Sequence, residues 1–169
     1  MNLAQAALIA EIIGGIAVLM TLVFLVIELR RNTDATRGAT QQTQVDSIVA
    51  VNLSIANDPE LASLVTKGNE NYASLTISEE LQLQAYFVNY FNLWHSAYWN
   101  HHKKLLDSSG YKICNIGCTS LLRNQRASRE AWSVWKSLYD DKFVAHVDKI
   151  IDTIGEVTSA ASGTYRNAT

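Results

Sequence analysis

Residues 3–29 read LAQAALIAEIIGGIAVLMTLVFLVIEL, the longest apolar run of the chain. Between Ile12 and Ile27 it contains no charged residue and one polar side chain, that of Thr21. As a helix, these 27 residues would extend about 40 Å at ~1.5 Å per residue, which exceeds the ~30 Å hydrocarbon core of a bilayer. The stretch therefore predicts one N-terminal transmembrane helix over residues 1–30.

A cleaved signal peptide is the alternative interpretation of the same stretch. A signal peptide has a basic first segment, a shorter apolar segment and a small-x-small cleavage site. Residues 1–29 contain no basic side chain, and the apolar run ends in Glu28-Leu29-Arg30-Arg31. These features favour a retained membrane anchor.

Arg30, Arg31 and Arg37 follow the apolar run directly, whereas no basic side chain precedes it. Basic residues collect on the cytoplasmic side of membrane helices. We therefore expect these arginines at the inner interface, the N-terminus outside and the C-terminal domain in the cytoplasm. Cysteines in that compartment would be reduced.

One face of the predicted helix is smaller and more polar than the other. Steps of three and four residues place on it Glu11, Gly14, Val18, Thr21, Leu25 and Glu28. The opposite face carries bulky residues such as Ile13, Ile16 and Met20. Small and polar residues at heptad spacing favour close helix association in lipid. This seam predicts a homo-oligomer or assembly with other membrane-protein subunits.

Glu11 has two possible placements. An intramembrane carboxylate would face protein or a water-filled path, as in ion pathways. Alternatively, residues 12–28 cross ~26 Å by themselves, which leaves Glu11 at the outer interface at lower cost. Glu28 precedes Arg30 and Arg31 and is expected at the inner interface.

The remainder of the chain predicts an all-α protein in which the membrane helix continues into a cytoplasmic helical bundle. There is one proline, Pro59, and no long run alternates apolar and polar residues. We expect a helical extension over 31–57 with a kink near Gly38, a bundle over 58–155 and a flexible tail over 156–169.

Start signals divide this bundle into shorter helices. A helix from Pro59 to about Asn69 follows a cap at Asn57 or Asp58, and the next begins near Ser78 with Thr76 or Ser78 as its cap. Asp107–Gly117 is expected to be irregular. The last elements predicted are a short helix over Thr119–Arg126, a helix capped by Ser128 and an amphipathic helix over Asp140–Ile154.

Aromatic residues form one face of the helix that starts near Ser78. They are Tyr86, Phe87, Tyr90, Phe91, Trp94 and Tyr98. This face predicts the core of the bundle, a surface at the lipid headgroups or a docking face for another subunit. A second span over residues 81–102 is an alternative, but its asparagines, glutamines and His95 would be costly in hydrocarbon.

His101, His102, Cys114 and Cys118 are weak candidates for zinc ligands. Cysteine and histidine are the usual ligands of zinc, but C-x3-C is not the common C-x2-C spacing. The alternative is two buried or idle thiols with ordinary polar histidines. We therefore expect neither a metal nor another cofactor.

No catalytic motif is present, and we expect no enzymatic activity. The chain lacks G-x-S-x-G, a phosphate loop, G-x-G-x-x-G and H-E-x-x-H. The carboxylate pairs Glu79-Glu80 and Asp140-Asp141 lie at predicted helix starts, where negative charge is stabilising. From Arg30 onward fourteen basic residues balance fourteen acidic ones, which gives no indication of nucleic-acid binding.

Residues 11–39, EIIGGIAVLMTLVFLVIELRRNTDATRGA, resemble the start of an uncharacterised family of small bacterial proteins. The shared patterns are E-I-x-G-x-I-A-V-x-x-T-L, then R-x-N-T-x-A-T-R, and D-P-E-L at Asp58–Leu61, followed by aromatic-rich helices. Residues 111–118 depart from the family pattern. The resemblance implies a bacterial inner-membrane anchor and a helical domain, and it transfers no catalytic residue.

These features lead to three functional hypotheses. The first is a homo-oligomer that assembles through the membrane seam and acts as a small ion channel or a scaffold. The second is an accessory subunit of a larger membrane complex. The third is a membrane-tethered sensor or metal-binding protein.

Overall fold

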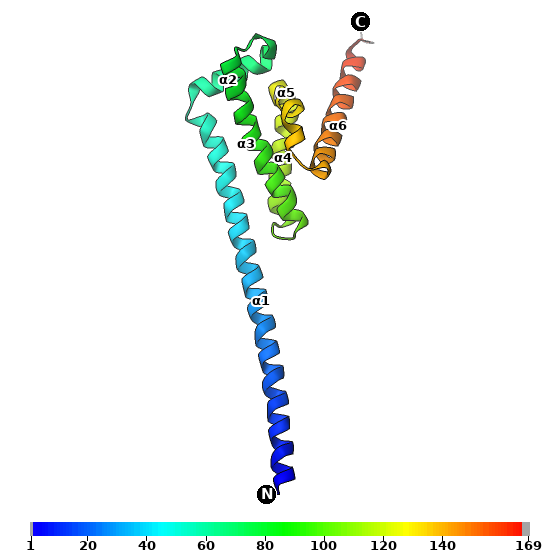
Figure 1. Cartoon of the computed structure of the whole chain (residues 1–169). Coiled ribbons are helices and arrows are strands. Elements are labelled where there is room, and N and C mark those ends of the chain that lie inside the picture. Colours follow the sequence, from blue (N-terminus) through cyan, green and yellow to red (C-terminus); the bar gives the residue numbers. More distant parts are fainter. Residues whose placement is uncertain (1, 167–169) are drawn as a thin grey trace. The chain divides into compact units, whose positions relative to one another are not determined.

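A computed structural model describes residues 2–166, of which residues 3, 6, 10 and 155–166 are described by their backbone alone. All regular elements in this range are helical, as the sequence predicts. Contacts divide the chain into two compact units, residues 1–40 and residues 41–169. The first unit is a single stretch of helix, and the second is a bundle (Figure 1).

The helix α1 spans Leu3–Ala56 and belongs to both units. The predicted extension of the N-terminal helix to about Asn57 is therefore confirmed, and no break in the helix occurs at Gly38. Threonine hydroxyls along its middle donate to carbonyls one turn earlier, as Thr33 does to Leu29 and Thr36 does to Asn32, each at 2.9 Å. These hydrogen bonds satisfy the hydroxyls within the helix itself.

The second unit consists of the last part of α1 and five further α-helices with two short 3-10 turns. Their bounds are α2 Pro59–Asn71, η1 Tyr72–Ser74, α3 Ile77–His102, α4 Ser108–Asn124, α5 Arg126–Trp135, η2 Lys136–Leu138 and α6 Asp141–Arg166. Helix α3 contacts α2, α4 and α5, and α4 contacts α6. The long α3 is therefore the central element of the bundle.

Local capping explains where α2 and α3 begin. The Asp58 side chain accepts a hydrogen bond from the Leu61 backbone N–H at 2.9 Å, and Pro59 occupies the first turn. Thr76 and Glu79 form a reciprocal capping box at the start of α3. The predictions of both starts are confirmed, with Asp58 and Thr76 as the caps among the alternatives considered.

The prediction that Asp107–Gly117 is irregular is wrong, because this segment is the first part of α4. Asp107 caps the helix through a 2.7 Å hydrogen bond from the Gly110 N–H, so the Ser-Ser-Gly sequence forms a first helical turn. Cys114, Cys118 and Leu122 are buried at four-residue spacing and hold α4 on the bundle. Residues 119–124 of the short helix predicted over Thr119–Arg126 are the C-terminal part of the same element, whereas Arg126 begins α5.

Ser128 does not cap the next helix, contrary to the sequence prediction. Helix α5 begins at Arg126, and Ser128 is fully buried within it. Its hydroxyl donates to the Gln125 carbonyl at 2.7 Å and lies 3.2 Å from the Leu121 carbonyl. The hydroxyl thus satisfies backbone groups at the α4–α5 junction instead of the start of a helix.

The apolar face predicted for the last helix is confirmed, and that helix is longer than expected. Phe143, Val147 and Ile154 of α6 are buried, while the helix continues to Arg166. The helix therefore continues past its predicted end at Ile154 into the segment predicted as a tail. Residues 167–169 of the predicted tail lie outside the described residues.

Candidate functional site

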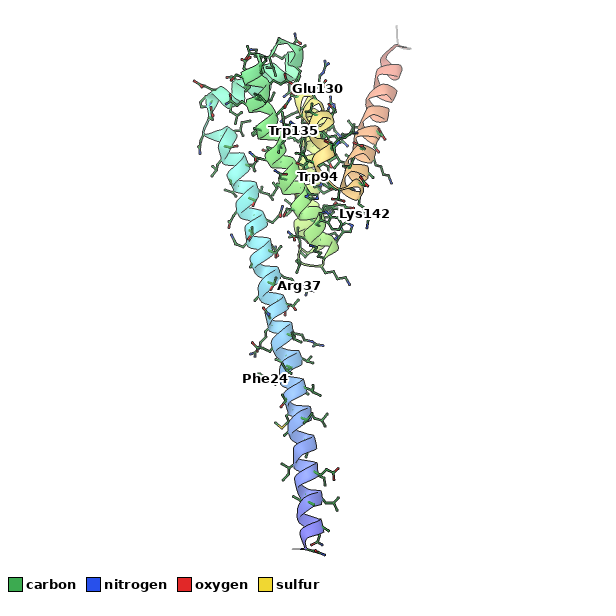
Figure 2. All side chains as sticks on the ribbon, in the orientation of Figure 1. Phe24, Arg37, Trp94, Glu130, Trp135 and Lys142 are labelled. Atoms are coloured by element: carbon green, nitrogen blue, oxygen red, sulfur yellow. The ribbon has the colours of Figure 1, made fainter. Side chains whose placement is uncertain are left out.

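The apolar segment of α1 has no cover within its own unit. Its large side chains from Ile12 to Ile27 are between 45% and 69% exposed, and Figure 2 shows Phe24 extending from the helix. Within the described residues, α1 is the single helix that is long and apolar enough to cross a membrane, and none of its apolar window is buried. A core helix of a soluble domain would bury this window, so its length, composition and exposure mark it as the candidate site.

The predicted seam residues lie on this uncovered helix. Val18 is 59% exposed and Leu25 is 49% exposed, and a Cβ added at Gly14 would meet no atom within 4 Å. The Thr21 hydroxyl donates to the Ala17 carbonyl at 2.9 Å, so it requires no partner outside the helix. Helical geometry places Glu11 and Glu28 on the same face as these residues.

The polar end of the first unit begins at Arg30. Arg30, Arg31 and Arg37 are all exposed, and the Arg37 guanidinium lies 3.5 Å from the Asp34 carboxylate one turn earlier. Exposed pairs of this kind contribute little to stability. Helix α1 thus passes without a break from an uncharged apolar segment into a charged segment that begins at Glu28.

The aromatic face of α3 forms the core of the bundle. Tyr86, Phe87, Phe91, Trp94 and Tyr98 are buried, and Tyr90 is packed against them (Figure 2 labels Trp94). The Trp94 ring meets Phe143 edge-to-face at a centroid separation of 5.7 Å, and its Nε1–H donates to the Asn115 amide oxygen at 3.1 Å. Burial removes the interpretations of this face as a headgroup surface, a docking face or a second span.

The two histidines and the two cysteines among the weak candidates for metal ligands lie in different environments. The His101 ring stacks on Tyr111 at 4.6 Å, and the His102 Nδ1 is bonded to the Tyr98 carbonyl at 2.7 Å. Cys114 and Cys118 are buried free thiols on α4. Among the described residues, no three histidine, cysteine, aspartate or glutamate side chains converge on one point.

Ionic contacts between helices were not predicted from the sequence. The His95 Nε2 and the Trp99 Nε1–H lie 2.9 and 2.8 Å from the Asp140 carboxylate, which also accepts from the Phe143 backbone N–H. Burial acts to raise the pKa of Asp140, but the hydrogen bonds from Trp99 and His95 outweigh it and lower the pKa to about 2. This cluster ties the start of α6 to α3.

A second ionic contact joins α2 to α3. The Lys67 ammonium lies 2.7 Å from Glu79, the residue that completes the α3 capping box. Hydrogen bonds from Lys67 and then from Thr76 lower the pKa of Glu79 to about 2. The acidic residues that the sequence places at helix starts thus have the predicted structural role, and two of them also connect helices.

Comparison of the chain with protein-family models, with curated proteins and with solved structures finds no match. The resemblance of residues 11–61 to a bacterial membrane-protein family therefore stays a prediction.

Proposed function

We propose that this protein is a membrane-anchored helical protein that self-associates through the seam of α1. The observation that carries the proposal is the apolar window of α1, which no other part of the described chain covers. In water this segment would expose a continuous apolar surface, which soluble monomers avoid. Burial in lipid removes that surface from water and leaves the helix backbone fully hydrogen-bonded.

The free energy of insertion favours this placement. Residues 12–27 include eleven leucine, isoleucine, valine and phenylalanine side chains. At ~0.3–0.6 kcal/mol each, these contribute roughly 3–7 kcal/mol toward insertion. An arginine near the centre costs ~2.5–3.5 kcal/mol. Two central arginines would therefore offset most of the gain.

Alkaline extraction of membranes from cells that express the full chain tests the anchor. We expect wild type in the membrane pellet and the Leu19→Arg/Leu22→Arg variant largely in the extract. The control variant Leu81→Arg/Leu138→Arg adds the same charge at exposed leucines of the second unit and should stay in the pellet. Wild type in the extract, or a mature chain that begins after Leu29, would refute the proposal.

The orientation that we propose places the second unit in the cytoplasm. Arg30, Arg31 and Arg37 follow the apolar segment, and the positive-inside rule assigns their side to the cytoplasm. Cysteine labelling from outside intact cells measures this directly. A cysteine introduced at Asn2 should react with an impermeant maleimide, whereas one introduced at Asn71 should not, and the reverse pattern would refute the orientation.

Self-association is proposed from the seam. Gly14 and Thr21 lie on a face where backbones can approach closely, and the Thr21 hydroxyl is already satisfied. The native mass of the particle in mild detergent should be a multiple of the chain mass of 18.8 kDa. Gly14→Leu should lower the copy number, whereas Ile16→Phe, which adds bulk on the opposite face, should not.

The same measurement separates the alternatives. A particle that contains one copy and no other chain would refute assembly along the seam. Co-purifying chains in fixed proportion would instead support the accessory-subunit hypothesis. That hypothesis now depends on the seam alone, because the aromatic face is buried.

An ion channel is the activity that we propose to test for the oligomer. Symmetric packing along the seam would place one Glu11 from each copy around a common axis, and Val18, Thr21 and Leu25 would form the constriction. A ring of carboxylates favours cations. Bilayer recordings should show a cation conductance that Glu11→Gln reduces, and the absence of conductance in any condition would leave a scaffold as the function.

A further inference from the structure

Three of the four histidines of the chain lie in one cluster of rings where α6 packs on α3 and α4. The His146 ring of α6 lies 5.2 Å from the Tyr98 ring of α3, and the His102 ring lies 4.1 Å from the same tyrosine. His101 stacks on Tyr111 of α4 at 4.6 Å. Histidine is the side chain whose ordinary pKa places its change of charge between about pH 5 and 8. The contact of α6 with its neighbours therefore contains groups that titrate near neutral pH.

His146 is the member of this cluster that joins α6 to α4. Its Nε2 lies 3.1 Å from the Tyr111 hydroxyl and 3.2 Å from the Asn115 amide oxygen, both on α4. The neutral ring can form either contact, because an Nε2–H donates to Asn115 and an unprotonated Nε2 accepts from Tyr111. The imidazolium forms no hydrogen bond with the described residues beyond those of the neutral Nε2–H ring. Hydrogen bonding therefore gives the charged form no advantage at this position.

The surroundings of His146 oppose its protonation. The ring is half-buried, and this burial lowers the pKa of His146. The positive charges of His102 on α3 and Lys149 on α6 lower that pKa further, and no carboxylate of the described residues compensates them. The remaining titratable groups that face the ring are the phenols of Tyr98 and Tyr111, which are uncharged near neutral pH. The docked position of α6 thus favours a neutral His146.

Two other polar contacts of α6 keep their charge in the same pH range. Asp140 has a pKa of about 2 and lies 2.9 Å from the His95 Nε2, so protonation of His95 adds an attraction there. Asp148 accepts from the Trp132 Nε1–H at 2.8 Å and lies 3.0 Å from the Lys136 ammonium. Burial acts to raise the pKa of Asp148, but these two hydrogen bonds outweigh it and lower the pKa. Mild acid therefore preserves both carboxylate contacts and weakens the contact between His146 and α4.

We propose that acidification loosens α6 from α4 through protonation of His146, while Asp140 and Asp148 keep α6 attached to α3 and α5. Because the docked helix favours the neutral ring, the contribution of His146 to stability is complete above the ordinary histidine pKa of about 6.5. That contribution is lost as the pH falls below this value. The inference concerns the second unit, and it does not depend on whether α1 spans a membrane or self-associates.

Hydrogen exchange of the full-length protein in mild detergent measures this loosening. Exchange is compared at pH 7.5 and 5.5 by peptide mass, after correction for the intrinsic effect of pH on amide exchange. One proton taken up on opening can raise the open population at most about tenfold one pH unit below 6.5. We expect residues 141–154 and 111–118 to lose about fivefold of their protection at pH 5.5. Residues 59–90 contain no histidine and should keep their protection.

Three matched variants assign the effect to one histidine. His146→Gln carries an amide that can donate to Asn115 and has no charge at any pH, so the loss of protection at pH 5.5 should disappear. His95→Gln is the control, because protonation of His95 favours the docked helix, and the loss should persist or grow. His102→Gln changes an exposed residue and removes one positive charge that opposes protonation of His146. The loss of protection should therefore be smaller in His102→Gln than in wild type, but still present.

Nuclear magnetic resonance of histidine-labelled protein gives an independent reading, in which His146 of wild type should titrate with a midpoint below the ordinary value of 6.5. A midpoint at or above that value would overturn the proposal. The same holds for an equal loss of protection in wild type and His146→Gln, or for no loss in wild type. Equal loss over residues 59–90 would show acid unfolding of the whole bundle and overturn it as well. If His146→Gln does not fold by circular dichroism, the midpoint and His102→Gln decide the question.

Discussion

Gly68 of α2 lies against Leu83 of α3, and this contact supports a sharp prediction about packing. A Cβ added at Gly68 would come within 2.4 Å of a Leu83 methyl and within 3.4 Å of the Ala127 Cβ. Leu83 and Ala127 are fully buried, so neither can move freely. Helices α2, α3 and α5 therefore meet at a point where a single methyl group changes the fit.

Gly68→Ala alone combines two opposing effects. Overpacking costs ~1–3 kcal/mol, and replacement of a helical glycine by alanine returns ~1 kcal/mol. We expect a net loss in the free energy of unfolding of roughly 1 kcal/mol. Leu83→Ala alone should cost about 3–5 kcal/mol, because it removes a buried side chain and leaves a cavity.

In the double variant the sign of the Gly68→Ala effect should reverse. Without the Leu83 methyl groups the added Cβ has room and fills part of the cavity. Gly68→Ala should then stabilise by about 1 kcal/mol, so that the coupling between the two sites is about 2 kcal/mol. Urea unfolding of the full chain in mild detergent measures these values. The four tryptophans lie between residues 94 and 135, so their fluorescence reports on the second unit.

Additive effects of the two substitutions on the free energy of unfolding would contradict this prediction. If Gly68→Ala changes the free energy of unfolding equally in both backgrounds, within ~0.5 kcal/mol, α2 and α3 do not touch at this point. Gly110→Ala is unsuitable as a control, because a Cβ added at Gly110 would come within 2.9 Å of a Leu106 methyl group. Gly38→Ala is a matched control, since an added Cβ there meets no atom within 4 Å and the change should be the same in both backgrounds.

Three further predictions concern single residues. Asp107→Ala should destabilise by about 1 kcal/mol in urea unfolding, because it removes the cap on the Gly110 N–H, and Asp107→Asn should retain most of the stability. The pKa of Asp140 is lowered from 3.8 to about 2, so its stabilising contact with His95 is complete above about pH 4 and is lost as the pH falls toward 2. In thermal unfolding, Asp140→Asn should therefore be less stable than wild type at pH 5. The difference in stability between the two proteins should shrink at pH 2. Gly38→Ala should increase protection of nearby amides from hydrogen exchange, because an exposed helical glycine costs ~1 kcal/mol relative to alanine.

Features that depend on residues within one turn could be predicted from the sequence. The cap at Asp58 and the Thr76–Glu79 capping box require neighbours three residues apart. The apolar run before Arg30 is likewise a property of composition. For these elements the local chain holds all of the information that the structure uses.

The sequence-based predictions are wrong or incomplete where contacts between residues distant in the chain determine which side chains are buried. In the last part of α1 the polar Gln44 is only 5% exposed, whereas the apolar Val45 and Val49 are 47% and 48% exposed. No local pattern could identify Gln44, because its partners Leu93 and Cys114 lie 49 and 70 residues away in the chain. The first part of helix α4 was not predicted for a similar reason, because its apolar residues are buried only by packing against α3.

The helical character of the chain and the apolar run before Arg30 could be predicted from the sequence, because helix caps and hydropathy depend on residues a few positions apart. Only the packed bundle shows that the aromatic face of α3 is core and that Cys114 and Cys118 of α4 are buried. Burial is a property of the packed surroundings, and each side chain in the bundle is covered by helices that the chain brings back from far along its length.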